Sequence, residues 1–385
     1  MTTGINPESW GSDAGLPPPR MLTCDWSGSA LKTESTFHQL SPYIGKLKSS
    51  IAGSLISQFT NAGDLVYDPF SGSGTVALEA WAAGRNVVAN DFSPYAASLT
   101  RAKLFPYRSL ADALADIECL SAEAEQLRNQ IDLRSVPAWV RRFFHAETLR
   151  ETLAWTRVLR RHRRWFLLAA LLGILHHQRP GFLSFPSSHT VPYLRLKAFP
   201  RAEYPELYEY RTLRDRLEAK LKRAFRRVPD LDFRLERRCC CRPAQLLDLD
   251  LDVDAIITSP PYMRQLDYAR DNRLRLWFLG VEDHRSLDRA ISPGEDDFLN
   301  LMRRCFVRWK TILTPKKYCV LVIGDASRGV EDGNLPERLS RMATDEVGGY
   351  CHVHEYTEAI PNERRVRRGL TGSTSETIVV LRYNA

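Results

Sequence analysis

Two short segments of the chain carry residue types whose order suits chemistry. Residues 68–75 read D-P-F-S-G-S-G-T, and residues 258–262 read T-S-P-P-Y. In the first segment, glycines allow a ligand to approach the backbone, and the free amides at a helix start would face it. In the second segment, rigid prolines hold a hydroxyl and a carbonyl, both of which accept hydrogen bonds. The first segment therefore predicts a ligand-binding loop, and the second a site for a hydrogen-bond donor.

The first segment favours a nucleoside over a phosphate or a dinucleotide. A phosphate-binding loop needs a Gly-Lys-Ser/Thr ending, which is absent here. A dinucleotide loop would need a third glycine where Val76 and Ala77 stand. Asp91 ends the next expected strand, where its carboxylate can accept hydrogen bonds from both ribose hydroxyls, and Phe92 can cover an adenine face. An ordinary glycine turn in an α/β unit is the alternative.

The second segment suits the activation of an exocyclic amine on a nucleic-acid base. Such an amine is a poor nucleophile because its lone pair is delocalised into the ring. Acceptors aimed at its hydrogens draw the nitrogen toward a tetrahedral shape and free the lone pair. The Ser259 hydroxyl and the Pro260 carbonyl are the expected acceptors, and Pro261 stiffens the loop. Tyr262 would stack on a base swung out of the duplex.

The elements around these segments predict an α/β fold. A helical stretch (51–59), a strand (64–68), a helix (75–83) and a strand (86–90) form the opening half of a doubly wound, mostly parallel sheet. Between about residues 95 and 230 the spacing is helical, interrupted by a proline-rich and aromatic-rich stretch. Further strands are expected at 233–238, 253–258, 318–323 and 377–381, with a helix at 298–312. Both chemical segments then follow strands, at the sheet edge where ligands of open α/β sheets bind.

Taken together, the two segments resemble motif I and motif IV of the S-adenosylmethionine-dependent amino-methyltransferases that act on DNA. The resemblance covers about residues 37–105 and 232–385 and implies a sheet of the class I methyltransferase type, with S-adenosylmethionine as cofactor. Residues 37–46 are similar to the segment that precedes motif I, which implies that Tyr43 and Lys46 lie near the methionine end of the cofactor. The expected cofactor-binding residues are Tyr43, Lys46, Asp68, Pro69, Phe70, Gly72, Gly74, Thr75, Asp91 and Phe92.

The resemblance also bears on the target base. In this family, Ser before Pro-Pro usually accompanies cytosine N4, whereas Asp usually accompanies adenine N6. Ser259 therefore favours N4 methylation of a flipped-out cytosine, with adenine N6 as the alternative. Cytosine C5 chemistry needs a cysteine, in its own family after a proline, and none of the 22 prolines is followed by cysteine. Weaker alternatives are an RNA guanine-N2 methyltransferase and an inactive DNA-binding regulator.

One departure from the family pattern concerns the third strand. The family often carries an aspartate near the end of that strand, bonded to the adenine amine of the cofactor. Here the region reads C-C-C-R-P-A, and no acid follows until Asp248. Backbone groups are the expected substitute.

Positive charge is concentrated in one part of the chain. The net charge is +8, but residues 101–240 hold 28 Lys+Arg and 16 Asp+Glu, a net of +12. This asymmetry predicts a polyanionic partner, with solvated helices as the alternative. The resemblance implies that this partner is double-stranded DNA. The sequence identifies neither a recognition sequence nor a cognate restriction endonuclease. The expected DNA contacts are Arg160, Arg161, Arg163, Arg164, Arg270, Arg273, Arg364 and Arg365.

We therefore expect three parts in the chain: a flexible arm (1–36), a methyltransferase domain (37–105 and 232–385), and a basic helical insertion for target recognition (106–231). No apolar run reaches the roughly 18 residues of a membrane span, and no secretory signal is visible. These features favour a cytoplasmic, nucleoid-associated protein. The eight cysteines follow no paired spacing, which favours reduced thiols without a metal, including at residues 351–354 (C-H-V-H).

Overall fold

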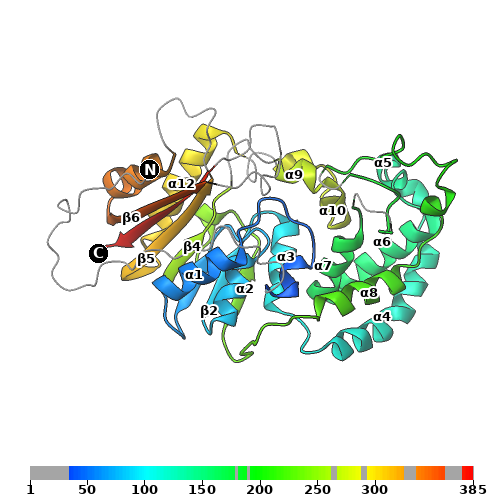
Figure 1. The fold of residues 1–385 in the computed structure, drawn as a ribbon, viewed down its shortest axis with the longest axis horizontal. Coiled ribbons are helices and arrows are strands. Elements are labelled where there is room, and N and C mark those ends of the chain that lie inside the picture. Colours follow the sequence, from blue (N-terminus) through cyan, green and yellow to red (C-terminus); the bar gives the residue numbers. More distant parts are fainter. Residues whose placement is uncertain are drawn as a thin grey trace.

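The computed structural model describes residues 34–177, 181–188, 191–261, 267–287, 293–324, 335–359 and 375–384. Its centre is a seven-stranded sheet with the strand order β3-β2-β1-β4-β5-β7-β6 (Figure 1). Strands β1 to β5 are parallel, and β7 runs antiparallel to both of its neighbours. This topology is the doubly wound, mostly parallel sheet of the class I methyltransferase type, as predicted. The strands are β1 (Leu65–Asp68), β2 (Asn86–Asn90), β3 (Arg237–Cys240), β4 (Val253–Thr258), β5 (Leu313–Gly324), β6 (Tyr350–Ala359) and β7 (Ser375–Tyr383).

Helices cover both faces of the sheet because the central strands are apolar on both sides. On one face, Ala255 and Ile257 of β4 pack into the core that contains α1, α2 and α3. On the other face, Ile256 packs into the core that contains α12 and α13. The helices of these two layers are α1 (Ser49–Phe59), α2 (Thr75–Ala82), α3 (Pro94–Leu104), α12 (Glu295–Trp309) and α13 (Leu335–Arg341), the last continued by the π-helix η8 (Met342–Val347).

Among the described residues, five further α-helices lie between α3 and β3 in the sequence, and Figure 1 shows them beyond α3, away from the sheet. Their central member, α7, is apolar all round because it packs against α3, α6 and α8. These helices therefore share one continuous core with α1, α2 and α3. They are α4 (Leu110–Gln130), α5 (Ala138–Arg141), α6 (Ala146–Arg161), α7 (Trp165–Ile174) and α8 (Leu213–Ala224).

The remaining elements are short, and several of them border the loops at the carboxyl edge of the sheet. Two of these, α9 (Tyr268–Asp271) and α10 (Arg273–Phe278), follow the loop after β4. Within the described residues, no helix combines the length and apolar character that a membrane crossing needs. The 3₁₀ turns are η3 (Thr36–Gln39), η4 (Leu133–Ser135), η5 (Pro205–Tyr208), η6 (Ala244–Leu246) and η7 (His284–Leu287).

A close contact between α7 and residues 40–41 holds the segment that leads into α1 in place. Gly173 in α7 lies against the backbone of the segment that follows η3. A Cβ atom at Gly173 would overlap the carbonyl oxygen of Leu40 and lie 3.1 Å from Cα of Ser41. This contact holds the next residues, including Tyr43, against the helical layer.

Candidate active site

The loop after β1 is closed by its own backbone and by α3. The Ser71 amide donates to the carbonyl of Asn90 at 2.8 Å, and the Gly74 amide donates to Ser71 at 2.6 Å. Gly72 and Gly74 adopt left-handed φ values of 50° and 73°. A Cβ at Gly74 would lie 2.9 Å from Cα of Thr100, so only glycine fits between the loop and α3. Helix α2 begins directly after this turn.

Asp91 closes the same loop from the end of β2. Its two carboxylate oxygens accept hydrogen bonds from the backbone amides of Gly72 and Ser93, each at 2.8 Å. Desolvation raises the pKa of Asp91 to about 6, and the two amide bonds act in the opposite direction. Each carboxylate oxygen retains acceptor capacity beyond one amide bond. Asp91 can therefore also accept hydrogen bonds from the hydroxyls of a ligand.

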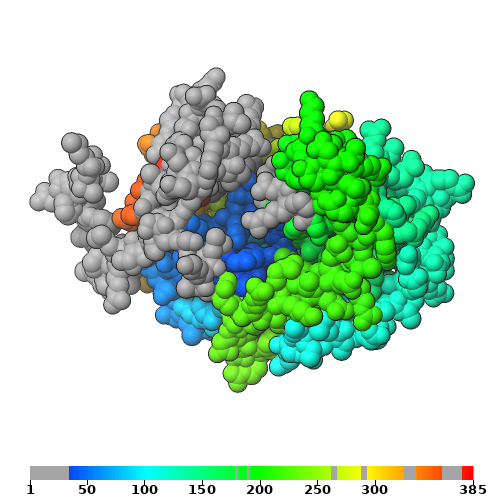
Figure 2. Space-filling view, turned by 45° about the vertical axis from the view of Figure 1, so that its right-hand side comes forward, coloured from blue at the N-terminus to red at the C-terminus, as the bar shows by residue number. Residues whose placement is uncertain are grey.

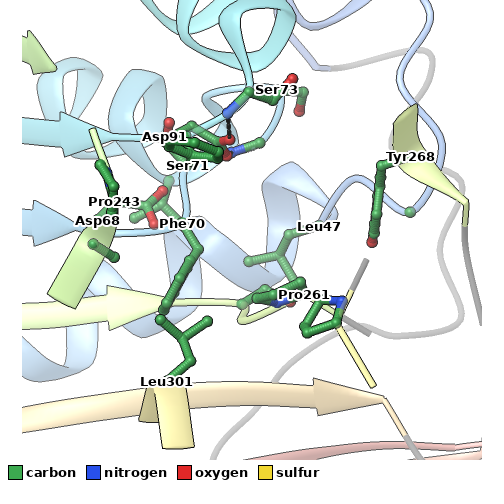
Figure 3. Close-up of a pocket in the computed structure, with 18 of the residues that line it drawn as sticks. Leu47, Asp68, Phe70, Ser71, Ser73, Asp91, Pro243, Pro261, Tyr268 and Leu301 are labelled. Carbon is green, nitrogen blue, oxygen red and sulfur yellow. Dashed lines mark hydrogen bonds between the residues drawn. The ribbon is translucent and has the colours of Figure 1, made fainter. Parts of the chain in front are cut away.

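A cavity of about 450 Å³ lies at this edge of the sheet, within the roughly 300–1,000 Å³ range of small-molecule sites. Figure 3 shows Asp68, Phe70 and Asp91 on one side of it and Pro261 and Tyr268 on the other. Three predicted residues, Pro69, Gly74 and Pro260, are buried but do not line it. The predicted residues that line it are Tyr43, Lys46, Asp68, Phe70, Gly72, Thr75, Asp91, Phe92, Ser259 and Pro261. Tyr262 is outside the described residues.

The cavity is also lined by residues that no sequence motif indicated. Pro243, Ala244 and Gln245 follow β3, where the family often has an acid, and Leu301 comes from α12. The apolar Pro243 and Ala244 supply no side-chain partner for an adenine amine. Their only signal in the sequence is their position after the third strand.

The loop after β4 is oriented by hydrogen bonds on both sides. The Thr258 hydroxyl donates to Oδ1 of Asp68 at 2.7 Å. The next residue, Ser259, donates its hydroxyl hydrogen to the backbone carbonyl of Val322 on β5 at 3.0 Å. Because that hydrogen is already committed, the lone pairs of the Ser259 oxygen are left as acceptors.

Asp68 is a buried carboxyl group at the floor of the cavity. Only 2% of its surface is exposed. Its pKa is raised to about 7, chiefly by desolvation, with the nearby Asp91 charge acting in the same direction and the hydrogen bond from Thr258 opposing both. The Asp68 carboxyl group therefore changes charge close to neutral pH.

Three tyrosine rings form a column, and two of them, Tyr43 and Tyr268, line the cavity. The ring of Tyr43 stacks between those of Tyr95 and Tyr268, with centroid distances of 6.0 Å on each side. The hydroxyl of Tyr95 donates to the carbonyl of Pro42 at 2.5 Å, which anchors the column to the chain before Tyr43. Burial raises the pKa of Tyr43 well above its ordinary value, so this ring remains neutral.

The predicted DNA-binding arginines at the end of α6 divide into two kinds. Arg161 and Arg164 form ion pairs with acidic residues of α4, Glu123 at 2.5 Å and Asp116 at 2.7 Å. The side chains of Arg160 and Arg163 are exposed and make no hydrogen bond or ion pair within the described chain. Two of the four charges are therefore already balanced.

The other predicted arginines also differ in their environment. Arg270 is exposed on α9. Arg273 is half-buried, donates to the carbonyl of Pro192 at 2.6 Å, and lies over the ring of Trp139. Arg364 and Arg365 are outside the described residues.

Residues 46–101, which hold the loop after β1 and Asp91, match a family model described as DNA methylase. The Type II methyltransferase M.MjaII of Methanocaldococcus jannaschii is 33% identical over 70 residues, 18% of this chain and 13% of that protein. Over this segment, the chain is therefore similar to the DNA amino-methyltransferase family. Between them, these matches cover only part of the chain and a small part of the curated relative, and they do not distinguish N4 from N6 members.

Solved methyltransferase structures superpose on this chain with low TM-scores. TrmN from Thermus thermophilus gives a TM-score of 0.34 at 13% identity, covering 90% of this chain and 52% of that chain. The rRNA methyltransferase aviRa from Streptomyces viridochromogenes gives 0.32 at 12% identity, covering 90% and 89%. The strand order described above, rather than these overlaps, defines the fold.

S-adenosylmethionine is the cofactor of this DNA amino-methyltransferase family, and the cavity fits it. The glycine loop leaves room beside the backbone, and the Asp91 carboxylate suits a pair of ribose hydroxyls. Phe92 and Pro243 provide apolar surface suited to an adenine ring. The residues that would hold the cofactor thus come from the loops after β1, β2 and β3.

Proposed function

We propose that this protein methylates the exocyclic amine of a base in double-stranded DNA, with cytosine N4 as the preferred target. One observation carries the proposal: Ser259, from the loop after β4, lines the same cavity as Asp91, from the loop after β2. A nucleoside held at Asp91 and an amine held at Ser259 would therefore share one enclosed space. Transfer between them needs no covalent attachment to the protein.

The residues of the chain would prepare the amine for attack. Ser259 gives its hydrogen to Val322, so its oxygen can accept one amine hydrogen. The Pro260 carbonyl, which follows Ser259 in the chain but does not line the cavity, stays the predicted acceptor of the other. S-adenosylmethionine, when bound, supplies an electrophilic methyl group on a sulfonium. Tyr262 remains the expected stacking partner of the flipped base.

The preference for cytosine rests on the serine at position 259. Family members with this residue before Pro-Pro usually act on cytosine N4, and those with aspartate on adenine N6. Adenine N6 is therefore the second candidate. Action on chromosomal DNA would place the protein at the nucleoid.

We propose that the helices between α3 and β3 hold the DNA duplex. This part of the sequence carries the excess positive charge, and it adjoins the catalytic layer through the core around α7. The exposed Arg160 and Arg163 are its best-placed phosphate contacts at the end of α6.

The deciding experiment is to express the protein in a host without DNA methylation and to measure modified nucleosides by mass spectrometry. We expect N4-methylcytosine with the wild type and none with Ser259→Ala. Calorimetry should show that Ser259→Ala binds S-adenosylmethionine within a few-fold of the wild type. N6-methyladenine would establish the second candidate. A folded wild type that binds the cofactor and leaves DNA unmodified would refute the proposal.

A further inference from the structure

A second cavity, of about 520 Å³, adjoins the first and shares Tyr43 and Lys46 with it. Its other walls come from the end of α7, from α8, and from α9 and α10. Figure 2 shows the dark blue chain that begins at residue 34 beside the yellow-green chain that contains α8. The second cavity thus lies between the catalytic layer and the helical insertion.

Positive charge dominates the lining of this second cavity. Asp271 is the one carboxylate among the described lining residues. Two histidines, His38 and His177, also line it. The cationic side chains are Lys46, Lys220, Arg223 and Arg275.

Arg275 is the most deeply buried of these cations, with 2% of its surface exposed. Its guanidinium donates to the carbonyl of Leu172 at 3.2 Å and to Oδ1 of Asn272 at 3.3 Å. The second terminal nitrogen has no hydrogen-bond partner among the described residues, and no ion pair joins Arg275 to a described carboxylate. A buried charge with neutral partners alone is costly, so an anion bound nearby would stabilise it.

Lys220 contributes a second cation from α8. Its ammonium group donates to the carbonyl of Gln39 at 2.7 Å, one of three hydrogen bonds that it can make. Burial lowers the pKa of Lys220 to about 8, and the neighbouring Arg223 charge acts in the same direction. An anion beside Lys220 and Arg223 would offset both effects.

We propose that this second cavity binds a backbone phosphodiester of the DNA substrate. The proposal rests on the proposed function. Arginine and lysine together suit a tetrahedral oxyanion, which accepts several charged hydrogen bonds at once. The wall shared through Tyr43 and Lys46 would place the phosphate beside the methylation site. A phosphate there would also connect the insertion helix α8 to the catalytic layer.

The cationic side chains of the second cavity would also suit free phosphate or the carboxylate of the cofactor. Protection of lysine from acylation distinguishes these two anions from a DNA phosphodiester. The full-length protein is labelled with an acylating reagent at pH 8, alone and with a short DNA duplex, inorganic phosphate or S-adenosylmethionine. Lys222, an exposed residue of the same helix that does not line the cavity, is the internal reference. We expect the duplex to lower acylation of Lys220 several-fold and that of Lys222 little, with S-adenosylmethionine leaving both unchanged.

Salt-dependent DNA binding provides an independent measurement. Lys220→Gln combined with Arg223→Gln should flatten the slope of log affinity against log salt by about 0.9, the contribution of one phosphate. Lys222→Gln should leave the slope unchanged.

Several outcomes would overturn the proposal. Protection of Lys220 by S-adenosylmethionine would assign the cavity to the cofactor, and protection by phosphate without protection by DNA would assign it to a free anion. Equal slopes for the double variant and Lys222→Gln would show that the phosphates bind elsewhere. Neither measurement requires methyl transfer, so protection by DNA without methylated bases would refute the proposed function and leave this inference standing.

Discussion

The hydroxyl of Thr258 joins the two functional loops through the carboxylate of Asp68. It donates to Asp68 at 2.7 Å and accepts a hydrogen bond from the Phe70 amide at 3.2 Å. The strands that carry these residues are parallel neighbours, with Tyr67 paired to Ile256. The loop after β1 and the loop after β4 therefore form one hydrogen-bonded unit.

This relationship predicts a pH dependence of stability. The pKa of Asp68 is about 7 in the folded protein and near 3.8 in the unfolded chain. The folded state therefore binds the Asp68 proton more tightly than the unfolded chain does. The stability that this bound proton contributes is lost as the pH rises from about 4 to 7. Asp68→Asn, which cannot ionise, should reduce that loss in urea unfolding measured at pH 5 and pH 8.

A variant of the donor provides the control for this prediction. Thr258→Val removes the bond that lowers the Asp68 pKa, so the pH-dependent loss of stability should begin at the same pH and extend to a higher pH than in the wild type. If Asp68→Asn and the wild type lose equal stability between pH 5 and pH 8, Asp68 does not titrate in this range.

The sheet and both loops could be predicted because the local sequence pattern of apolar runs, glycines and prolines favours the same elements that the tertiary structure contains. The strand at β4 was predicted with the bounds that the structure has, Val253–Thr258. This segment has four buried apolar residues, and Pro260-Pro261 soon after it would end a helix. The sequence therefore favours a short buried strand. The predicted bounds of β3 were wrong: the strand was predicted at 233–238 and lies at Arg237–Cys240. An edge strand of arginines and cysteines has little hydrophobic pattern from which to predict its bounds.

Features that depend on distant contacts were not predictable from the sequence. Arg275 lies close in the sequence to Arg270 and Arg273, which were predicted to contact DNA, yet Arg275 is buried. Helical spacing alone does not show that Leu172 of α7 would face it. The role of Gly173 likewise depends on a backbone 133 residues earlier, at Leu40.

The Asp91 carboxylate should control cofactor affinity. Loss of a buried, charge-assisted bond costs roughly 1–3 kcal/mol, so Asp91→Ala should weaken S-adenosylmethionine binding by about ten-fold or more in calorimetry. Because the pKa of Asp91 is about 6, wild-type affinity should fall as the pH drops from 8 to 5. Asp91→Asn should bind weakly with a flat pH profile. Unchanged affinity in Asp91→Ala would move the ribose contact to another residue, with Asn90 the first candidate.

The contact between α7 and the entering chain predicts a difference between two glycine variants. Gly173→Ala would force the Cβ against the carbonyl oxygen of Leu40, an overpacking that typically costs about 1–3 kcal/mol. Gly53→Ala, inside α1, meets its nearest atom at 3.6 Å and should be stabilised by about 0.5–1 kcal/mol through helix propensity. Urea unfolding should therefore give midpoints on opposite sides of the wild type. A Gly173→Ala midpoint at or above the wild-type value would contradict this close packing.

The arginines at the end of α6 allow a matched test of DNA binding by the insertion. Arg160 and Arg163 are exposed and form no ion pair within the described chain, whereas Arg161 and Arg164 are paired with Glu123 and Asp116. Each phosphate contact contributes about 0.9 to the slope of log affinity against log salt. Arg160→Gln with Arg163→Gln should therefore flatten the slope by about two.

The same change of charge at the paired positions provides the control. Arg161→Gln with Arg164→Gln should flatten the slope less, because Glu123 and Asp116 already balance those charges. S-adenosylmethionine binding should be unchanged in both double variants, since Asp91 and the glycine loop belong to another layer. If both pairs leave the slope at its wild-type value, this end of α6 is a solvated helix face. The duplex would then be held by other basic residues, such as those that line the second cavity.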